Sequence, residues 1–367
     1  MYYFKSQRLF GITNDQILLL RAALLEPNEA IKYWQLWRNF ERPYSVLKNT
    51  DSVSIFSNLD TESLRLLPLI YKNIGQSNDL LLPILKETYR MTCMQNLQLL
   101  KKAQDIVKFC NEEGIPTMLL KGLPMSLVYY KDMGVRPMGD VDLLVPLENV
   151  DKTVKLLSDL GHTPEVVEEK YRDYIHAMHC SDLQGWDVDL HWQVFFFQDG
   201  SSVSIQSDAV NCQEIALSAS LKTTVLNDSL QLFHTIIHGL LEGKGILRWI
   251  TDAVAILRTE GVKIDYEFLN RYAKQTNTDQ VLMFGLKFIE DLLGQKIEGI
   301  AALNRKFNAQ IFYLRLTKWG PRSFLAISLR MLLRNALHCI LFRPDKPLRS
   351  QIVWFWGMLR LRIAQSK

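Results

Sequence analysis

Residues 135–145, VRPMGDVDLLV, place two aspartates at the front of an apolar run. The preceding proline and glycine indicate a loop, and the apolar run predicts a buried strand. Side chains two residues apart in a strand share a face, so Asp140 and Asp142 present their carboxylates together. Val141 and Leu143 face the opposite way. Adjacent carboxylates near a buried strand end favour a bound proton or a cation, and paired oxygen ligands suit Mg²⁺ or Mn²⁺.

The segments around this strand predict a small mixed sheet. Residues 115–120, IPTMLL, have strand character and are followed by a sharp turn and a short helix. Residues 174–180, YIHAMHC, and 186–196, WDVDLHWQVFF, also have strand character, and the short segment SDLQG between them predicts an antiparallel hairpin. The second hairpin strand can lie beside the strand of Asp142, which makes Asp189 the best candidate for a third carboxylate.

Apolar residues at three- and four-residue spacing predict helices before and after this sheet. The expected fold class is therefore α+β, a small mixed-sheet core flanked by N-terminal and C-terminal helical regions. We expect an N-terminal helical region at 1–100, the core at 101–217, and a C-terminal helical region with a basic tail at 218–367. A chain of 367 residues, 48% hydrophobic and 22% charged, has the composition of an ordinary globular protein.

The charge and cysteine patterns indicate the cellular location and the possible binding partners of the protein. Five scattered cysteines without CxxC spacing, and a start without a secretory signal, predict a reducing, cytoplasmic location. Residues 301–367 hold thirteen Lys or Arg and one acidic residue, a net charge of +12, whereas the preceding 300 residues carry −8. Such a tail suits contact with RNA, with an anionic membrane surface or with a polyphosphate substrate, and a solvated cationic surface is the alternative. The sequence makes no prediction of oligomeric state.

The central motif resembles a known signature. Residues 119–145, LLKGLPMSLVYYKDMGVRPMGDVDLLV, are similar to the strand, glycine turn, short helix and two-aspartate strand of the polymerase-beta-type nucleotidyltransferase superfamily. More narrowly, the chain resembles a family of uncharacterised bacterial nucleotidyltransferases. The upstream LLPLIYKNI and the downstream VDLHW, FHTIIHG and LRWITDAVAIL carry this closer similarity, which covers most of the chain in the same order.

The resemblance implies a metal-dependent nucleotidyltransferase. It moves a nucleoside monophosphate from an NTP such as ATP to a hydroxyl or phosphate acceptor and releases pyrophosphate, with Mg²⁺ or Mn²⁺ as cofactor. The implied acceptor is a small molecule, a sugar or a peptide. The implied catalytic and metal-binding residues are Asp140, Asp142 and Asp189, and the implied nucleotide-binding residues are Lys121, Gly122 and Arg136.

One departure from the superfamily pattern favours a second hypothesis. The glycine of the turn is usually followed by Gly or Ser, but this chain has Leu123, so a hydroxyl contact to phosphate is missing. The alternative function is a catalytically inactive module that keeps the fold and binds a nucleotide or a protein partner. The three aspartates favour the enzyme, and Leu123 favours the binding module.

Several polar residues near the motif allow two interpretations. Arg136 is either a phosphate clamp or the ion-pair partner that steadies the two aspartates. Asp187 is either a solvated strand residue or a replacement for Asp189 as third ligand. The set Arg248, Trp249 and Asp252 is interpreted as an internal anchor held by a salt bridge and aromatic packing.

Five residues suggest other metal chemistry. His234 and His238 lie four residues apart and share a helix face, a spacing that suits a metal site, core packing or a substrate contact. His176, His179 and Cys180 in the hairpin allow a zinc cluster, although their spacing is irregular. Packing or hydrogen bonding is the preferred interpretation for both groups.

Overall fold

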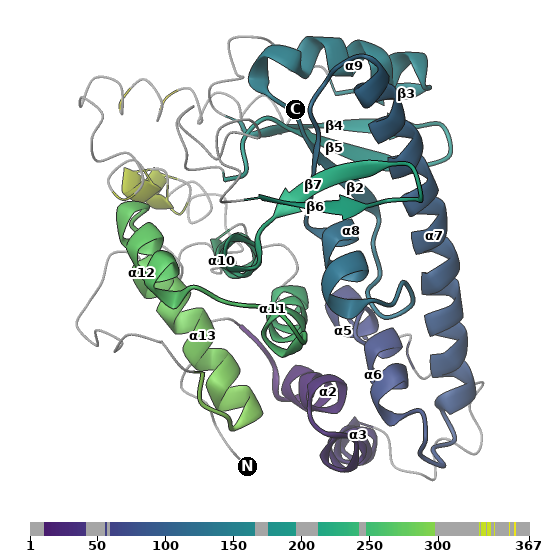
Figure 1. Ribbon diagram of the computed structural model, residues 1–367. Helices are drawn as coiled ribbons and strands as arrows, with labels where there is room; N and C mark the ends of the chain where they lie inside the picture. Colours follow the sequence, from purple (N-terminus) through teal and green to yellow (C-terminus); the bar gives the residue numbers. More distant parts are fainter. Residues whose placement is uncertain are drawn as a thin grey trace.

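The computed structural model describes residues 11–41, 59–165, 175–195, 212–241 and 247–297, with Phe56 and isolated positions between 330 and 356. Within these ranges helices surround a mixed seven-stranded sheet, which confirms the α+β class (Figure 1). The basic tail lies almost entirely outside the described residues, so RNA and membrane contact stay predictions. None of the helices in the described ranges has the length and apolar character needed to cross a bilayer.

Helices come before, within and after the sheet. The N-terminal helices are α2 (Asn14–Leu24), α3 (Pro27–Glu41), α5 (Thr61–Leu64), α6 (Leu67–Ile74) and α7 (Leu82–Glu112). Between strands lie α8 (Gly122–Pro124), the π-helix η2 (Met125–Tyr130), the 3-10 helix η3 (Leu147–Asn149) and α9 (Val150–Asp159). The C-terminal helices are α10 (Asp228–Leu241), α11 (Arg248–Arg258), α12 (Tyr266–Gln275) and α13 (Asp279–Leu293).

The strands form one sheet in the order β3-β4-β5-β2-β1-β7-β6. They are β1 (Met118–Leu120), β2 (Asp140–Leu144), β3 (His162–Pro164), β4 (Ala177–Asp182), β5 (Asp187–His191), β6 (Cys212–Ala216) and β7 (Lys222–Leu226). The β4–β5 hairpin is confirmed, and β5 lies beside β2 as expected, in parallel orientation. Strands β3, β6 and β7 were not predicted. The expectation that only helices follow residue 218 is wrong, because β7 pairs with β1 inside the sheet.

One face of the sheet is apolar and packs against α7. Alternate side chains of β2 and β5 join α7 and α9 in a buried cluster. The strand residues on this face are Leu119, Val141, Leu143, Val188 and Leu190, all 2% exposed or less. Because apolar burial is the main favourable contribution to folding, this face anchors the strands and fixes which of their side chains point the other way.

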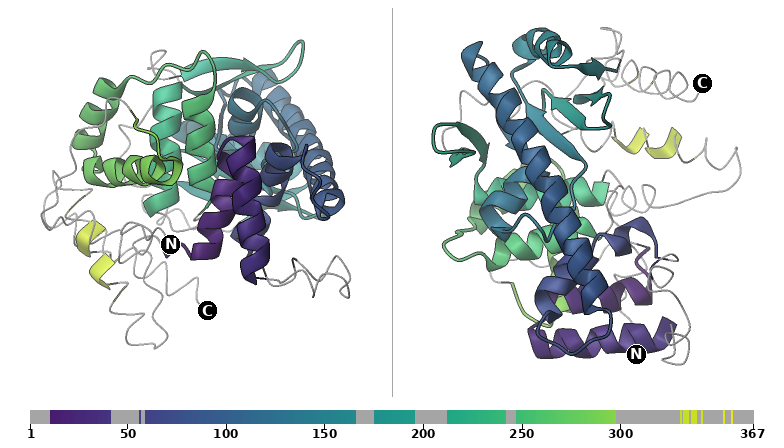
Figure 2. Two further views of the ribbon diagram at one scale, coloured as in Figure 1. Left: turned by 90° about the horizontal axis from the view of Figure 1, so that it is seen from below. Right: turned by 90° about the vertical axis from the view of Figure 1, so that its right-hand side faces the viewer.

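The other face looks toward α10 and α11 (Figure 1). Met118, Leu120 and Leu144 join these helices in a second apolar cluster, which also contains residues of α2, α6 and α13. Helix α2 contacts both α11 and α13, so helices from the two ends of the described chain pack together (Figure 2). Helix α7 runs through residue 100, and β7 follows residue 217. The three-region division of the chain stays a prediction.

Candidate active site

The register of β2 and β5 gathers polar side chains on the face opposite α7. Asp140 lies opposite Asp187, Asp142 opposite Asp189, and Leu144 opposite His191. Aligned residues of neighbouring strands point to the same side, and residues two apart along a strand share that side. The alternation in DVDLL and DVDLH therefore sends the apolar residues to α7 and the carboxylates toward α10 and α11.

A cavity of about 370 Å³ lies over this polar face. The turn after β1, strand β2, the β4–β5 hairpin, α10 and α11 all contribute to its wall. Its titratable lining consists of Lys121, Arg136, Asp140, Asp142, Glu165, His176, His179, Asp189, His191, His234, His238, Arg248 and Asp252. All six candidate site residues line it, since Gly122 also belongs to the wall. Asp187 does not, which favours Asp189 as the third carboxylate.

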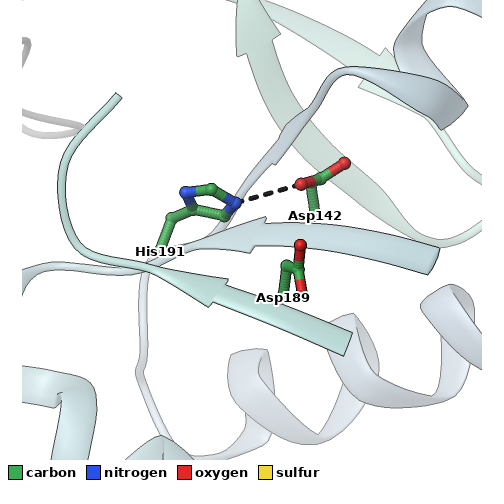
Figure 3. Close-up of side chains that lie close together, drawn as sticks. All are labelled: Asp142, Asp189 and His191. Atoms are coloured by element: carbon green, nitrogen blue, oxygen red, sulfur yellow. Dashed lines mark hydrogen bonds and ion pairs between the residues drawn. The ribbon is translucent and has the colours of Figure 1, made fainter. Parts of the chain in front are cut away.

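Asp142 is held by two partners through one oxygen. Lys121 Nζ donates to its Oδ1 at 2.6 Å, and His191 Nε2 lies 3.0 Å from the same atom (Figure 3). Burial alone raises the pKa of Asp142, but Lys121 and His191 outweigh burial and hold the pKa well below its usual value. The second oxygen, Oδ2, accepts no hydrogen bond from the described residues. Asp142 is thus ionised and keeps one oxygen for a ligand.

Asp140 has a different environment. Its carboxylate makes no hydrogen bond or ion pair with any described residue. Burial raises the pKa of Asp140, and the negative charges of Asp142 and Asp189 raise it further. A partly buried carboxylate beside two others is costly unless a cation or a proton compensates it. Asp140 is the least compensated carboxylate of the three.

Asp189 contacts His179 on the neighbouring strand of the hairpin, and its carboxylate points toward Asp142. His179 Nδ1 lies 2.8 Å from Asp189 Oδ1, and His179 Nε2 lies 3.4 Å from Asp187 Oδ1. The hydrogen bond to Asp189 raises the pKa of His179. In Figure 3 the Asp189 carboxylate points into the space next to Asp142 and His191. Ligand atoms of Asp142, Asp189 and His191 all lie within 4.8 Å of one another.

This donor set fits a divalent cation. Carboxylate oxygens are the ligands that Mg²⁺ and Mn²⁺ prefer, and a third donor from imidazole is compatible with Mn²⁺. Asp140 lies beyond this closely spaced trio but repels two of its members. The cavity therefore offers one compact set of ligand atoms and an additional carboxylate next to it.

The turn before α8 has unusual backbone geometry. Lys121 has φ +51°, a region that side-chain-bearing residues seldom adopt and that costs about 1–3 kcal/mol. A Cβ at position 122 would lie 2.8 Å from Met138 Sδ and 3.2 Å from Arg136 Nη1, so glycine lets these side chains close over the turn. Leu123 points into the apolar cluster under α7. Its side chain is therefore part of the core and does not face the cavity.

Arg136 is bound to α11. Its Nε and Nη2 donate to both carboxylate oxygens of Asp252 at 2.9–3.1 Å, and Tyr130 donates to the same carboxylate at 3.0 Å. Burial alone lowers the pKa of Arg136, but Asp252 outweighs it and raises the pKa. The interpretation of Arg136 as ion-pair partner of the two strand aspartates is wrong, because its partner is Asp252. The salt bridge expected within the set of Arg248, Trp249 and Asp252 is not formed, because Asp252 pairs with Arg136.

Helices α10 and α11 close the cavity opposite the strands. The rings of His234 and His238 stack with centroids 5.4 Å apart, and both line the cavity. A Cβ on Gly239 would lie 2.2 Å from Trp249 Cβ, so glycine permits the close approach of α10 to α11. The two histidines belong to no group of metal-ligand atoms among the described residues. A substrate contact is the interpretation that their position in the wall supports.

The zinc cluster considered for the hairpin does not form. Cys180 packs in the apolar cluster beneath α7, on the face opposite His179. His176 lies against His191 instead, with ring centroids 5.5 Å apart. Alternation along β4 explains the separation, because neighbouring residues of a strand point to opposite faces.

Two cavity residues were undervalued from the sequence. The sequence assigned no role to His191, yet it contacts Asp142 directly. Its position two residues after Asp189 was the available signal. Arg248 was interpreted as part of a structural anchor, but it lines the cavity and makes no salt bridge with Asp252. Its spacing of four residues from Asp252 suggested a salt bridge between the two, but Asp252 pairs with Arg136.

The fold and the cavity first define a class of protein, an α+β protein whose mixed sheet carries clustered carboxylates in the wall of a cavity. Residues 61–294 match the family described as uncharacterised nucleotidyltransferase. This match spans more than half of the chain, and the chain belongs to that family. No curated protein sequence matches it.

Two solved structures show limited similarity. The crystal structure of the lincosamide antibiotic adenylyltransferase LnuA, bound to lincomycin, has 15% sequence identity and a TM-score of 0.33, covering 43% of this chain and 96% of that chain. The solution structure of the antibiotic-resistance factor ANT(2'')-Ia has 14% identity and a TM-score of 0.33, covering 49% of this chain and 96% of that chain.

Proposed function

We propose that the protein is a metal-dependent nucleotidyltransferase that transfers a nucleoside monophosphate from an NTP to a hydroxyl or phosphate group of a small acceptor. The acceptor oxygen forms a bond to the α-phosphorus, the bond from that phosphorus to the bridging oxygen breaks, and pyrophosphate leaves with the electron pair. A hydroxyl acceptor loses its proton to solvent. Membership of the nucleotidyltransferase family supports the reaction class.

The observation that carries this proposal is the poor compensation of Asp140. It lies beside Asp142 and Asp189 in one cavity and forms no ion pair with any described residue, and the charges of Lys121 and Arg248 do not outweigh burial and the two neighbouring carboxylates, which raise its pKa. Five carboxylates and three Lys or Arg side chains line the described part of the cavity wall. A polyphosphate would be repelled by this surface unless divalent cations accompanied it.

The residues of the site have separate roles in this proposal. Asp140, Asp142 and Asp189 would hold Mg²⁺ or Mn²⁺, and His191 is a further donor. When bound, such ions lower the pKa of an attacking hydroxyl and offset charge on the leaving pyrophosphate. Lys121 keeps Asp142 ionised and oriented through the 2.6 Å contact. Gly122 leaves room for the turn to approach the donor nucleotide.

A nucleotidyl-transfer assay tests the proposal. Purified protein is incubated with each labelled NTP, Mg²⁺ or Mn²⁺, and a panel of sugars and short peptides, while pyrophosphate release and label transfer are measured. We expect Asp142→Asn and Asp189→Asn to lower the rate by about 1,000-fold, which corresponds to about 4 kcal/mol. Asp105→Asn is the matched control, because Asp105 lies on α7 and is exposed. Equal rates in all four proteins would refute the role of these carboxylates.

The binding-module hypothesis has one structural argument in its favour. Lys121 Nζ already occupies one oxygen of Asp142 and neutralises part of the cluster. A module without turnover would bind the NTP but release no pyrophosphate at any metal concentration. The same assay, combined with equilibrium binding of ATP, therefore separates the two functions.

A further inference from the structure

Arg248 begins α11 and lines the cavity that also contains the three aspartates. The other two Lys or Arg side chains of the described wall have anionic partners. Lys121 pairs with Asp142, and Arg136 makes a bidentate pair with Asp252. Arg248 makes no hydrogen bond through its guanidinium group and no ion pair with any described residue.

The nearest carboxylate along α11 cannot serve Arg248 as a salt-bridge partner. Asp252 lies one helical turn further on, but its two oxygens already accept hydrogen bonds from Arg136 Nε and Nη2 and from Tyr130. Burial lowers the pKa of Arg248, and the charges of Arg136 and Arg65 lower it further. A partly buried guanidinium beside two others is stabilised by an anion, and no described residue supplies one within salt-bridge distance.

Asp140 and Arg248 line the same cavity and carry opposite charges, and neither forms an ion pair with a described residue. The positive charge of Arg248 lowers the pKa of Asp140, yet the two side chains form no ion pair. A divalent cation would compensate Asp140, and a polyphosphate bound to that cation would compensate Arg248. Planar guanidinium groups suit phosphate because they donate two parallel hydrogen bonds.

We infer that Arg248 is the residue of this chain that binds the polyphosphate of the NTP donor, a role for which the sequence suggested Lys121 and Arg136. The inference deepens the proposed function and rests on it for the identity of the donor. Lys121 donates a hydrogen bond to Asp142 and keeps this carboxylate ionised, whereas the guanidinium group of Arg248 lines the cavity without a salt bridge to any described residue. Arg136 positions α11 against the turn at Gly122 through its pair with Asp252.

Equilibrium binding of ATP, inorganic tripolyphosphate, adenosine and glucose 6-phosphate tests this assignment in the presence of Mg²⁺. In Arg248→Gln we expect the dissociation constants of ATP and tripolyphosphate to rise at least about tenfold. Binding of adenosine, which has no phosphate, is expected to stay within twofold. In Arg248→Lys the dissociation constants of ATP and tripolyphosphate should lie between those of the wild type and Arg248→Gln, because lysine keeps the charge and loses the bidentate geometry.

Arg271→Gln is the matched control, since Arg271 is an exposed arginine on α12 outside the cavity. It should bind all four compounds like the wild type. ATP binding that is unchanged in folded Arg248→Gln overturns the inference, and so does an equal loss of ATP and adenosine binding. Selective loss of glucose 6-phosphate binding would also overturn it, since Arg248 would then serve a phosphorylated acceptor. Pyrophosphate release, measured on the same preparations, reports separately on the proposed function.

Discussion

Strands β2 and β5 present alternate residues to two very different surroundings. Toward α7 they contribute Val141, Leu143, Val188 and Leu190, which are buried among apolar side chains. Toward α10 and α11 the same strands contribute carboxylates and an imidazole around a cavity. The first face stabilises the sheet by burying apolar area, and the second gathers like charges that destabilise it. Burial on the apolar face therefore offsets the electrostatic cost of the face that carries the candidate site.

The largest expected effect comes from placing a carboxylate on the apolar face. Leu143 is fully buried, and Leu143→Asp would leave an anion without a partner or water. We expect the free energy of unfolding to fall by about 5 kcal/mol or more, measured by urea denaturation. Leu143→Met is the control and should cost less than about 1.5 kcal/mol. A Leu143→Asp protein as stable as the control would mean that the two faces do not differ as described.

A smaller effect is expected where the helices that cover the acidic face meet. Gly239→Ala would push a Cβ into Trp249 and force α10 away from α11. We expect the free energy of unfolding to fall by about 2 kcal/mol, again measured with urea. Gly139→Ala is the matched control, since no atom lies within 4 Å of an added Cβ there. Equal stability of the two variants would show that the cavity wall tolerates this displacement.

The smallest expected effect has the opposite sign. Asp140→Asn removes one of three repelling carboxylates, so in EDTA the melting temperature should rise by about 2 °C. Adding Mg²⁺ and ATP should raise the melting temperature of the wild type more than that of this variant, because the variant lacks one of the carboxylates proposed to bind the metal. Asp105→Asn on α7 controls for the loss of a charge. A lower melting temperature of Asp140→Asn in EDTA would show that Asp140 is compensated in a way that the structure does not reveal.

Local patterns in the sequence predicted much of this face. The alternation in DVDLLV and WDVDLH predicted both strands and the side on which Asp140, Asp142 and Asp189 lie. The alternation also indicated that the two strands could pair with their carboxylates on one face, although it did not fix the register, because a shift of two residues keeps every side chain on the same face.

Long-range pairs could not be predicted from local patterns. Arg136 and Asp252 are 116 residues apart, and nothing in the spacing around either residue indicates the other. Strands β6 and β7 are five residues each and precede a long apolar helix, so their short alternation was overlooked. The partner of Lys121 depends on a backbone conformation with positive φ that lysine seldom adopts.

Calorimetric titration of Mn²⁺ into the purified protein, in the presence of ATP, tests most directly whether the acidic face exists to hold divalent cations. The wild type should bind Mn²⁺ in a saturable manner, with Mg²⁺ as a competitor. Asp189→Asn should bind at least about tenfold more weakly, because one ligand of the compact set is lost. Identical binding curves for the two folded proteins, or no heat of binding in the wild type, would contradict the assignment of this face as a metal and nucleotide site.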